Sequence, residues 1–168
     1  MVELTTRRLL LRPLGLEDAA AISALLNGDA EAIRMTERLP HPCTIEAARA
    51  WISLRLRPGD QVFGVLEQGG TFVGGIGFAR AGAVAELGYW IGRAFWSQGY
   101  ATEAVAAVLV HARAQGVCTI VAEVFVDNPA SSRVLTKNGF AEVGTITKDS
   151  IPTREGPQLL RKFVLDLC

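Results

Sequence analysis

The chain has no long uninterrupted apolar run and no excess of either charge. Its apolar stretches are broken by charged residues or glycine well short of the roughly 18 residues that a membrane span needs. The 17 basic and 17 acidic residues leave a formal net charge of zero, which supplies no basic surface for nucleic acid. Any phosphate group must therefore be bound by local geometry rather than by the overall field. We expect neither a membrane segment nor a nucleic-acid partner.

Cysteine and histidine are also scarce. Cys43, Cys118 and Cys168 are scattered and form no Cys-x-x-Cys pair, so we expect neither a disulfide framework nor a zinc site. His41 and His111 are too far apart in the chain to suggest a metal site, and His111 fits a structural, buried position better. The first residues contain no apolar signal core followed by a cleavage site. These features predict a reduced, cytoplasmic protein without a metal.

What the chain does have is the composition of a globular protein. Its 168 residues, 49% apolar and 20% charged, suit one α+β domain over residues 1–168. Apolar periodicity and breaker residues predict helices at 18–26, 30–35, 44–56, 101–115 and 129–137, and strands at 9–12, 61–67, 71–79, 85–91, 119–126, 141–148 and 158–165. Pro58-Gly59-Asp60 predicts a turn and Gly69-Gly70 a tight hairpin. We expect a mixed, mostly antiparallel sheet of about seven strands flanked by helices, with the parallel part in 85–126, where a helix joins two strands.

The most informative segment runs from Phe95 to Ala104, between a predicted strand and a predicted helix. A glycine and small residues there allow backbone N–H groups to gather around an anion at the start of the helix. The amides expected to face the anion belong to Gln98, Gly99, Tyr100, Ala101 and Thr102. A plain glycine-containing turn is the alternative. A second signature downstream, from Asn128 to Phe140, favours binding of a cofactor that carries a pyrophosphate.

The order of elements and both signatures resemble the GNAT superfamily of acetyl-CoA-dependent N-acetyltransferases, and within it the Rim-type branch of ribosomal-protein N-terminal acetyltransferases. The resemblance covers essentially the whole chain, including the opening strand Thr6–Arg12 and the strand Glu86–Ile91. The superfamily's pyrophosphate loop is written (Gln/Arg)-x-x-Gly-x-(Gly/Ala). Gly99 and Ala101 fit it, whereas Trp96 stands at the first place. The resemblance implies acetyl-CoA as co-substrate, no metal, and central strands that splay apart to admit the pantetheine arm.

The resemblance also implies positions for the reacting groups. The thioester would lie near Trp90 and Ile91, where a backbone N–H can polarise its carbonyl. Glu86 shares a strand face with Gly88 and Trp90, so its carboxylate is a candidate general base, directly or through water. The alternative role for Glu86 is that of a surface glutamate or of a partner in an ion pair that faces a helix. Glu123 is the competing carboxylate, and a direct base need not exist if water carries the proton away.

Two residues of the second signature are candidates for the cofactor side. Ser131 aligns with a helix serine that contacts the sulfur of coenzyme A in the family, where a hydrogen bond to the thiolate suits its weak acidity. Many members place a tyrosine nearby for this task. Asn128 could bind the pantetheine or adenosine part, or cap the helix that follows. With no covalent nucleophile set in the sequence, direct transfer is favoured over a covalent intermediate.

The acceptor is left open by the sequence. A protein N-terminal amine and a small molecule such as an amino acid, polyamine or aminoglycoside all fit the resemblance. The segments 30–56 and 148–157 are expected to shape the acceptor pocket, because loops carry specificity. We expect a monomer or a homodimer. The rival hypothesis is a regulatory module that binds coenzyme A but has lost catalysis.

Overall fold

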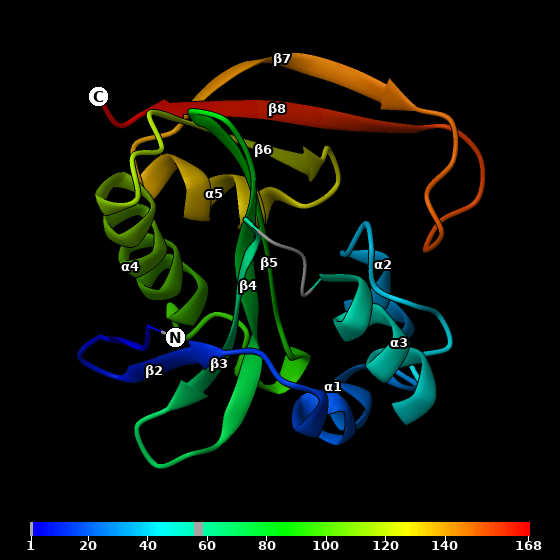
Figure 1. The fold of residues 1–168 in the computed structure, drawn as a ribbon. Coiled ribbons are helices and arrows are strands. Elements are labelled where there is room, and N and C mark those ends of the chain that lie inside the picture. The colour runs from blue at the N-terminus through cyan, green and yellow to red at the C-terminus, as the bar shows by residue number, and fades with distance from the viewer. Residues whose placement is uncertain (1, 56–58) are drawn as a thin grey trace.

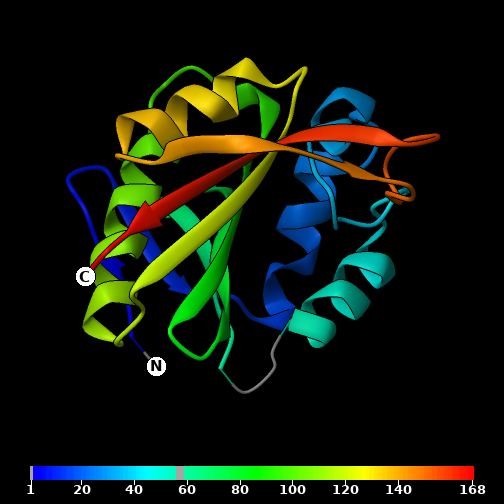
Figure 2. The same ribbon diagram turned by 90° about the horizontal axis from the view of Figure 1, so that it is seen from above.

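A computed structural model describes residues 2–55 and 59–168. In this described part of the chain, eight strands form one open sheet in the order β1-β2-β3-β4-β5-β6-β8-β7. The strands are β1 (Leu4–Thr5), β2 (Leu9–Pro13), β3 (Gln61–Glu67), β4 (Phe72–Ala81), β5 (Val84–Ile91), β6 (Thr119–Phe125), β7 (Ala141–Lys148) and β8 (Gln158–Asp166). The α-helices are α1 (Ala19–Leu26), α2 (Ala30–Arg34), α3 (Ile45–Arg55), α4 (Tyr100–Ala114) and α5 (Pro129–Lys137). Helices α1–α3 lie on one side of the central strands and α4 and α5 on the other (Figures 1 and 2).

The predicted α+β class and mixed sheet are confirmed, with one strand more than expected. The extra strand, β1, has only two residues, too short to show an alternating pattern. The hairpin at Gly69-Gly70 is present, closed by the bond from Glu67 N to Thr71 O at 2.9 Å. Thr44 caps α3 as predicted, because its hydroxyl accepts from Ala47 N at 3.1 Å. The predicted end of this helix at Leu56 and the start of the turn at Pro58 lie outside the described residues.

The sheet splits at its centre. Strand β5 pairs in parallel with β6 only over Val84–Glu86, opposite Thr119–Val121. Beyond this point β5 continues to Ile91 alongside β4, while β6 continues to Phe125 alongside β8. The predicted splay of the central strands is therefore confirmed. It leaves one edge of each strand unpaired in the middle of the sheet.

Apolar side chains form a core on each side of the sheet. The larger core lies against α4 and α5 and the smaller one among α1–α3, with Trp90 contributing from β5. His111 on α4 is 8% exposed and lies near Phe63 and Phe78, with ring centroids 5.8 and 6.3 Å away. Burial lowers its pKa. The structural role expected for His111 is thus confirmed.

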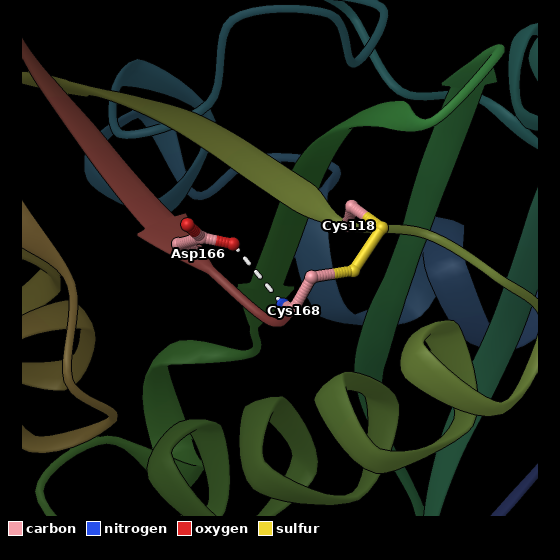
Figure 3. The surroundings of a disulfide bond; sticks show 3 residues. All are labelled: Cys118, Asp166 and Cys168. Atoms are coloured by element: carbon pink, nitrogen blue, oxygen red, sulfur yellow. Dashed lines mark hydrogen bonds between the residues drawn. A yellow bond between two sulfur atoms is a disulfide. The ribbon is translucent and has the colours of Figure 1, made fainter.

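The expectation that no disulfide forms is wrong, because Cys118 and Cys168 are bonded to each other (Figure 3). The two residues are 50 positions apart in the chain, but β6 and β8 run antiparallel with Thr119 opposite Asp166. This pairing brings Cys168 beside Cys118, the residue that directly precedes β6. Sequence spacing alone does not reveal this register. The remaining cysteine, Cys43, is free and buried. Because of the disulfide, the expectation of a fully reduced chain is also wrong.

Candidate active site

The predicted anion-binding loop precedes α4 in the structure. Gly99 is the residue before the helix and has φ of 81°, a left-handed conformation that costs a side-chain-bearing residue energy. The N–H groups of Tyr100, Ala101 and Thr102 occupy the first helical turn, where an α-helix offers no acceptor. These three amides donate to no acceptor among residues 2–55 and 59–168. The loop therefore offers a cluster of unpaired donors at the positive end of a 15-residue helix.

Arg8, which the sequence reasoning did not single out, braces this loop. Its Nε donates to the Glu103 carboxylate at 2.7 Å and its Nη1 to the Gln98 carbonyl at 2.8 Å. Burial alone would raise the pKa of Glu103, but the bonds from Thr6 and Arg8 hold it below its usual value. The departure from the family pattern at Trp96 also has a structural role, since its indole N–H donates to Ile91 O at 2.6 Å. The loop is thus attached to the end of β5.

The unpaired edge of β5 presents backbone amides to the gap between β5 and β6. The N–H of Gly92 bonds Val73 O on the β4 side at 2.8 Å. Alternate residues of an antiparallel ladder point the same way, so the N–H of Trp90 also faces β4. The amides of Tyr89 and Ile91 face the gap, beyond the last β5–β6 pair. Of the two residues predicted to polarise a carbonyl, Ile91 therefore offers an N–H in the gap and Trp90 does not.

A pair of hydroxyl groups lies at the same gap. The Tyr89 hydroxyl is 2.7 Å from Ser131 Oγ and donates to Ser131 O at 3.2 Å. Burial raises the pKa of Tyr89 to about 12, although the bond with Ser131 by itself lowers it. Ser131 is held in the first turn of α5 because its N–H donates to Asn128 Oδ1 at 3.1 Å. Asn128 therefore caps α5, which is one of the two roles predicted for it.

The sequence reasoning missed Tyr89 although the strand that contains it was singled out. The alternation of side chains along the strand was the sequence feature that could have revealed the direction of Tyr89. Glu86, Gly88 and Trp90 share one face, so Tyr89 had to point to the opposite face, toward the helix that carries Ser131. No sequence feature fixed the contact between Tyr89 and Ser131, because it depends on how α5 packs across the gap.

Carboxylates and cationic side chains meet on the other side of β5. Glu86 forms an ion pair with Arg38, from the segment after α2. Glu123 of β6 and Glu37 share the ammonium group of Lys148, at the end of β7. Burial alone would lower the pKa of Lys148, but its bonds to Glu123 and Glu37 raise it above the ordinary value. The ammonium therefore stays charged at neutral pH.

The three carboxylates lie close enough together to hold a metal ion, with one oxygen from each within 4.8 Å of the others. Each of them already contacts a cationic side chain, so the cluster is largely neutralised from within the chain. The expectation that the protein uses no metal stays a prediction.

One cavity joins these features. Its lining includes Glu86, Tyr89, Glu123, Asn128 and Ser131. Apolar side chains complete the wall, among them Leu14, Leu39, Trp51, Val62 and Phe125. The carboxylate cluster, the hydroxyl pair and the unpaired edge of β5 thus open onto a shared space. The loop predicted to bind an anion lies at the far end of β5 and is connected to it through Trp96.

The segment between β7 and β8 is fastened across one end of this region. The Arg154 side chain is 7% exposed and forms a two-point pair with Asp127, with bonds of 2.9 and 3.0 Å. It also donates to Arg34 O at 2.9 Å and lies 3.7 Å from the centre of the Phe125 ring. Residues from 30–56 line the cavity directly. The segment 148–157 contributes through Lys148 and Arg154, which hold the cavity wall.

None of the helices within residues 2–55 and 59–168 combines the length and the apolar character needed to cross a membrane.

Comparison with known proteins gives a consistent result. Residues 8–141 match the family described as Acetyltransferase (GNAT) domain. The chain is 34% identical over 152 residues to the uncharacterized N-acetyltransferase YoaA of Bacillus subtilis, covering 85% of each chain. It superposes with a TM-score of 0.86 at 19% identity on RimL, a ribosomal L7/L12 alpha-N-protein acetyltransferase in complex with coenzyme A, covering 98% of both chains. Mycobacterium smegmatis RimJ gives a TM-score of 0.83 at 22% identity, covering 99% of this chain and 86% of that one.

Proposed function

Because the chain belongs to the GNAT acetyltransferase family, we propose that it transfers an acetyl group from acetyl-CoA directly to a primary amine. One observation carries the proposal: the pairing of β5 and β6 stops after Glu86, and the gap that follows opens onto a cavity with carboxylates on one side and the Tyr89–Ser131 pair on the other. A thioester held between these groups would meet a base on one side and a hydrogen-bond donor for its sulfur on the other.

The first task is to bind the co-substrate. The amides at the start of α4, from Gln98 to Thr102, would hold the pyrophosphate. The unpaired edge of β5 would bind the pantetheine arm through its amides, and the N–H of Tyr89 or Ile91 would donate to the thioester carbonyl. Such a donor stabilises the oxyanion that forms when the amine attacks. RimL, whose fold is similar, binds coenzyme A in its structure, which supports the choice of acyl donor.

The chemical step moves one proton and breaks one bond. The neutral amine nitrogen attacks the carbonyl carbon, its surplus proton passes to a base, and the C–S bond then breaks to leave the thiolate of coenzyme A. Ser131 would donate its one hydroxyl proton to that thiolate, while its Oγ accepts the proton of the Tyr89 hydroxyl, which turns for this purpose from Ser131 O to Ser131 Oγ. The products are an acetylated amine and coenzyme A.

Glu86 is the carboxylate that we propose as base, directly or through a water molecule. Its side chain is 35% exposed in the cavity, and its partner Arg38 is itself half exposed. Exposed ion pairs of this kind contribute little energy and exchange readily. Glu123 is 17% exposed, and its carboxylate is already engaged by Lys148, which also binds Glu37.

Two assays test the proposal together. Acetyl-CoA should raise the melting temperature through preferential binding to the folded protein, and a panel of amines and peptides should show amine-dependent release of thiol with matching acetylated product. Binding without transfer to any amine or peptide would favour the inactive regulatory module. Glu86→Gln should depress kcat/KM at neutral pH, with a deficit that shrinks at high pH where more acceptor is already neutral. Glu123→Gln is the matched control, and a parallel pH profile for both variants would assign proton removal to water.

A further inference from the structure

We infer that the acceptor is a primary monoamine with an apolar body, and that Gly88 provides the space for that body. The inference rests on the proposed function and adds the class of acceptor. It depends on three features of the cavity: a bare stretch of backbone in its floor, the balance of charge around it, and the apolar character of its walls.

The floor of the cavity is open at Gly88. This residue lies in the middle of the sheet, opposite Gly77 on β4, yet it is exposed. It points to the same side of β5 as Glu86 and Trp90. A Cβ placed on Gly88 would meet no atom of the described residues within 4 Å, and its backbone does not require glycine. A central strand normally carries a side chain at such a position, so the missing one leaves room directly beside the candidate base.

The charges around this space favour a single positive charge on the acceptor. Glu37, Glu86 and Glu123 face two cationic groups, those of Arg38 and Lys148, among the described residues. One negative charge is therefore left over at the cluster. The other charged residues of the cavity lining, Arg55 and Asp60, are one of each sign and leave this balance unchanged. One surplus charge suits one ammonium group, whereas a polyamine or an aminoglycoside would bring several.

The walls favour an apolar substituent on that amine. Leu14 and Leu39 are buried with 4% and 3% exposure, and both line the cavity. Trp51 and Val62 are half buried and line it as well. An apolar group placed there removes further apolar surface from water, at roughly 25 cal/mol per Å². The same chemistry is available from an arylalkylamine and from a peptide whose first residue is apolar.

The first experiment fills the space above Gly88. In the series Gly88→Ala, Gly88→Val and Gly88→Leu, KM for phenethylamine should rise with side-chain size, by about tenfold or more for leucine, since one to a few displaced methylene groups are worth that much in a pocket. KM for methylamine and the acetyl-CoA melting shift should stay near wild type. Gly69→Leu is the matched control, because Gly69 also has open space and an ordinary backbone conformation but lies in the β3–β4 hairpin. Unchanged phenethylamine kinetics in Gly88→Leu, or loss of acetyl-CoA binding in that variant, would overturn the inference.

The second experiment compares acceptors. Phenethylamine and a Leu-Gly-Gly peptide separate the two sources of an apolar monoamine, and Glu-Gly-Gly, spermidine and kanamycin are the counterparts. At least one apolar monoamine should exceed all three counterparts by tenfold or more in kcat/KM. Glu37→Gln should raise KM for the preferred monoamine, because it removes the surplus negative charge. A preference for spermidine or kanamycin, with transfer intact, would refute the acceptor class alone.

Acceptor binding can also be read without turnover, from the further rise in melting temperature that an amine produces in the presence of coenzyme A. Transfer to no amine at all would refute the proposed function. The order of these melting shifts would still decide the acceptor class, with a larger shift from spermidine than from phenethylamine counting against it.

Discussion

Replacing Tyr89 by phenylalanine tests what the hydroxyl pair does for the leaving group. Burial raises the pKa of Tyr89 to about 12, whereas an alkyl thiol such as cysteine has a pKa near 8.5. The thiol is thus the stronger acid by about 3.5 pKa units. Full proton transfer from the phenol to the departing thiolate would be uphill by about 5 kcal/mol, at ~1.4 kcal/mol per unit. The pair should therefore stabilise the thiolate by hydrogen bonding, with the phenol proton staying on oxygen.

Tyr89→Phe removes the partner that orients Ser131 Oγ, 2.7 Å away. We expect kcat to fall by roughly ten- to a thousandfold, the range for loss of one transition-state hydrogen bond, with KM for acetyl-CoA nearly unchanged. Because the phenol remains protonated throughout the range in which the enzyme can be assayed, the fold-loss should be the same at every pH below about 10.

The measurement is single-turnover transfer from acetyl-CoA, which isolates chemistry from product release. Ser131→Ala should show a similar loss, and the double variant should lose little more than either single one, because the two residues act as a unit. Unchanged single-turnover rates in Tyr89→Phe would refute the reasoning. A loss of kcat that changes steeply between pH 7 and 9, which is about the range of the thiol pKa, would show instead that proton delivery contributes.

Three further predictions address the co-substrate, the disulfide and the acid stability. Gly99→Glu should abolish the acetyl-CoA melting shift, because it places a negative charge at the loop proposed to bind the pyrophosphate. Gly82→Glu is the control, at another left-handed glycine with open space around it, and should retain the shift. Equal affinity for coenzyme A in both folded variants would contradict the loop assignment. Cys168→Ser should lower the free energy of unfolding by about 2–4 kcal/mol in non-reducing urea titrations, because it opens a loop of 50 residues, and dithiothreitol should erase the difference from wild type. Burial lowers the pKa of His111, so the unfolded chain takes up a proton before the folded one as pH falls, and the free energy of unfolding should decline below about pH 6.5. In His111→Gln this decline should be shallower. An identical slope in the variant would count against a buried, neutral imidazole.

Much of the fold was predictable because its signals are local. Strands β3, β7 and the helix α5 have the bounds that apolar periodicity predicted. The short strand β1 was not predictable, since two residues carry no period and its position depends on pairing with β2. The splay was inferred from family resemblance, because no local pattern specifies where pairing between β5 and β6 stops.

In the candidate site, too, local features could be predicted from the sequence and long-range contacts could not. The loop before α4 could be recognised because its motif residues, such as Gly99 and Ala101, lie within one short stretch of sequence. The contacts of Tyr89 and Arg8 could not, since each joins segments separated by 40 residues or more, Tyr89 to Ser131 and Arg8 to Gln98. The disulfide was missed for the same reason. Register between distant strands, not the spacing of cysteines, brings Cys118 and Cys168 together.

The two halves of the site are linked through Arg154. This side chain contacts Asp127, which directly precedes the cap residue of α5, and it also contacts the backbone at Arg34, just before the segment that carries Glu37 and Arg38. The bonds from Arg154 hold the pKa of Asp127 below its usual value, so the pair stays charged at neutral pH. The wall that would face the acceptor and the turn that positions Ser131 are therefore fixed to one buried guanidinium. Because interior packing transmits strain, a substitution in the segment between β7 and β8 should affect both acceptor KM and kcat, even though that segment does not itself line the cavity.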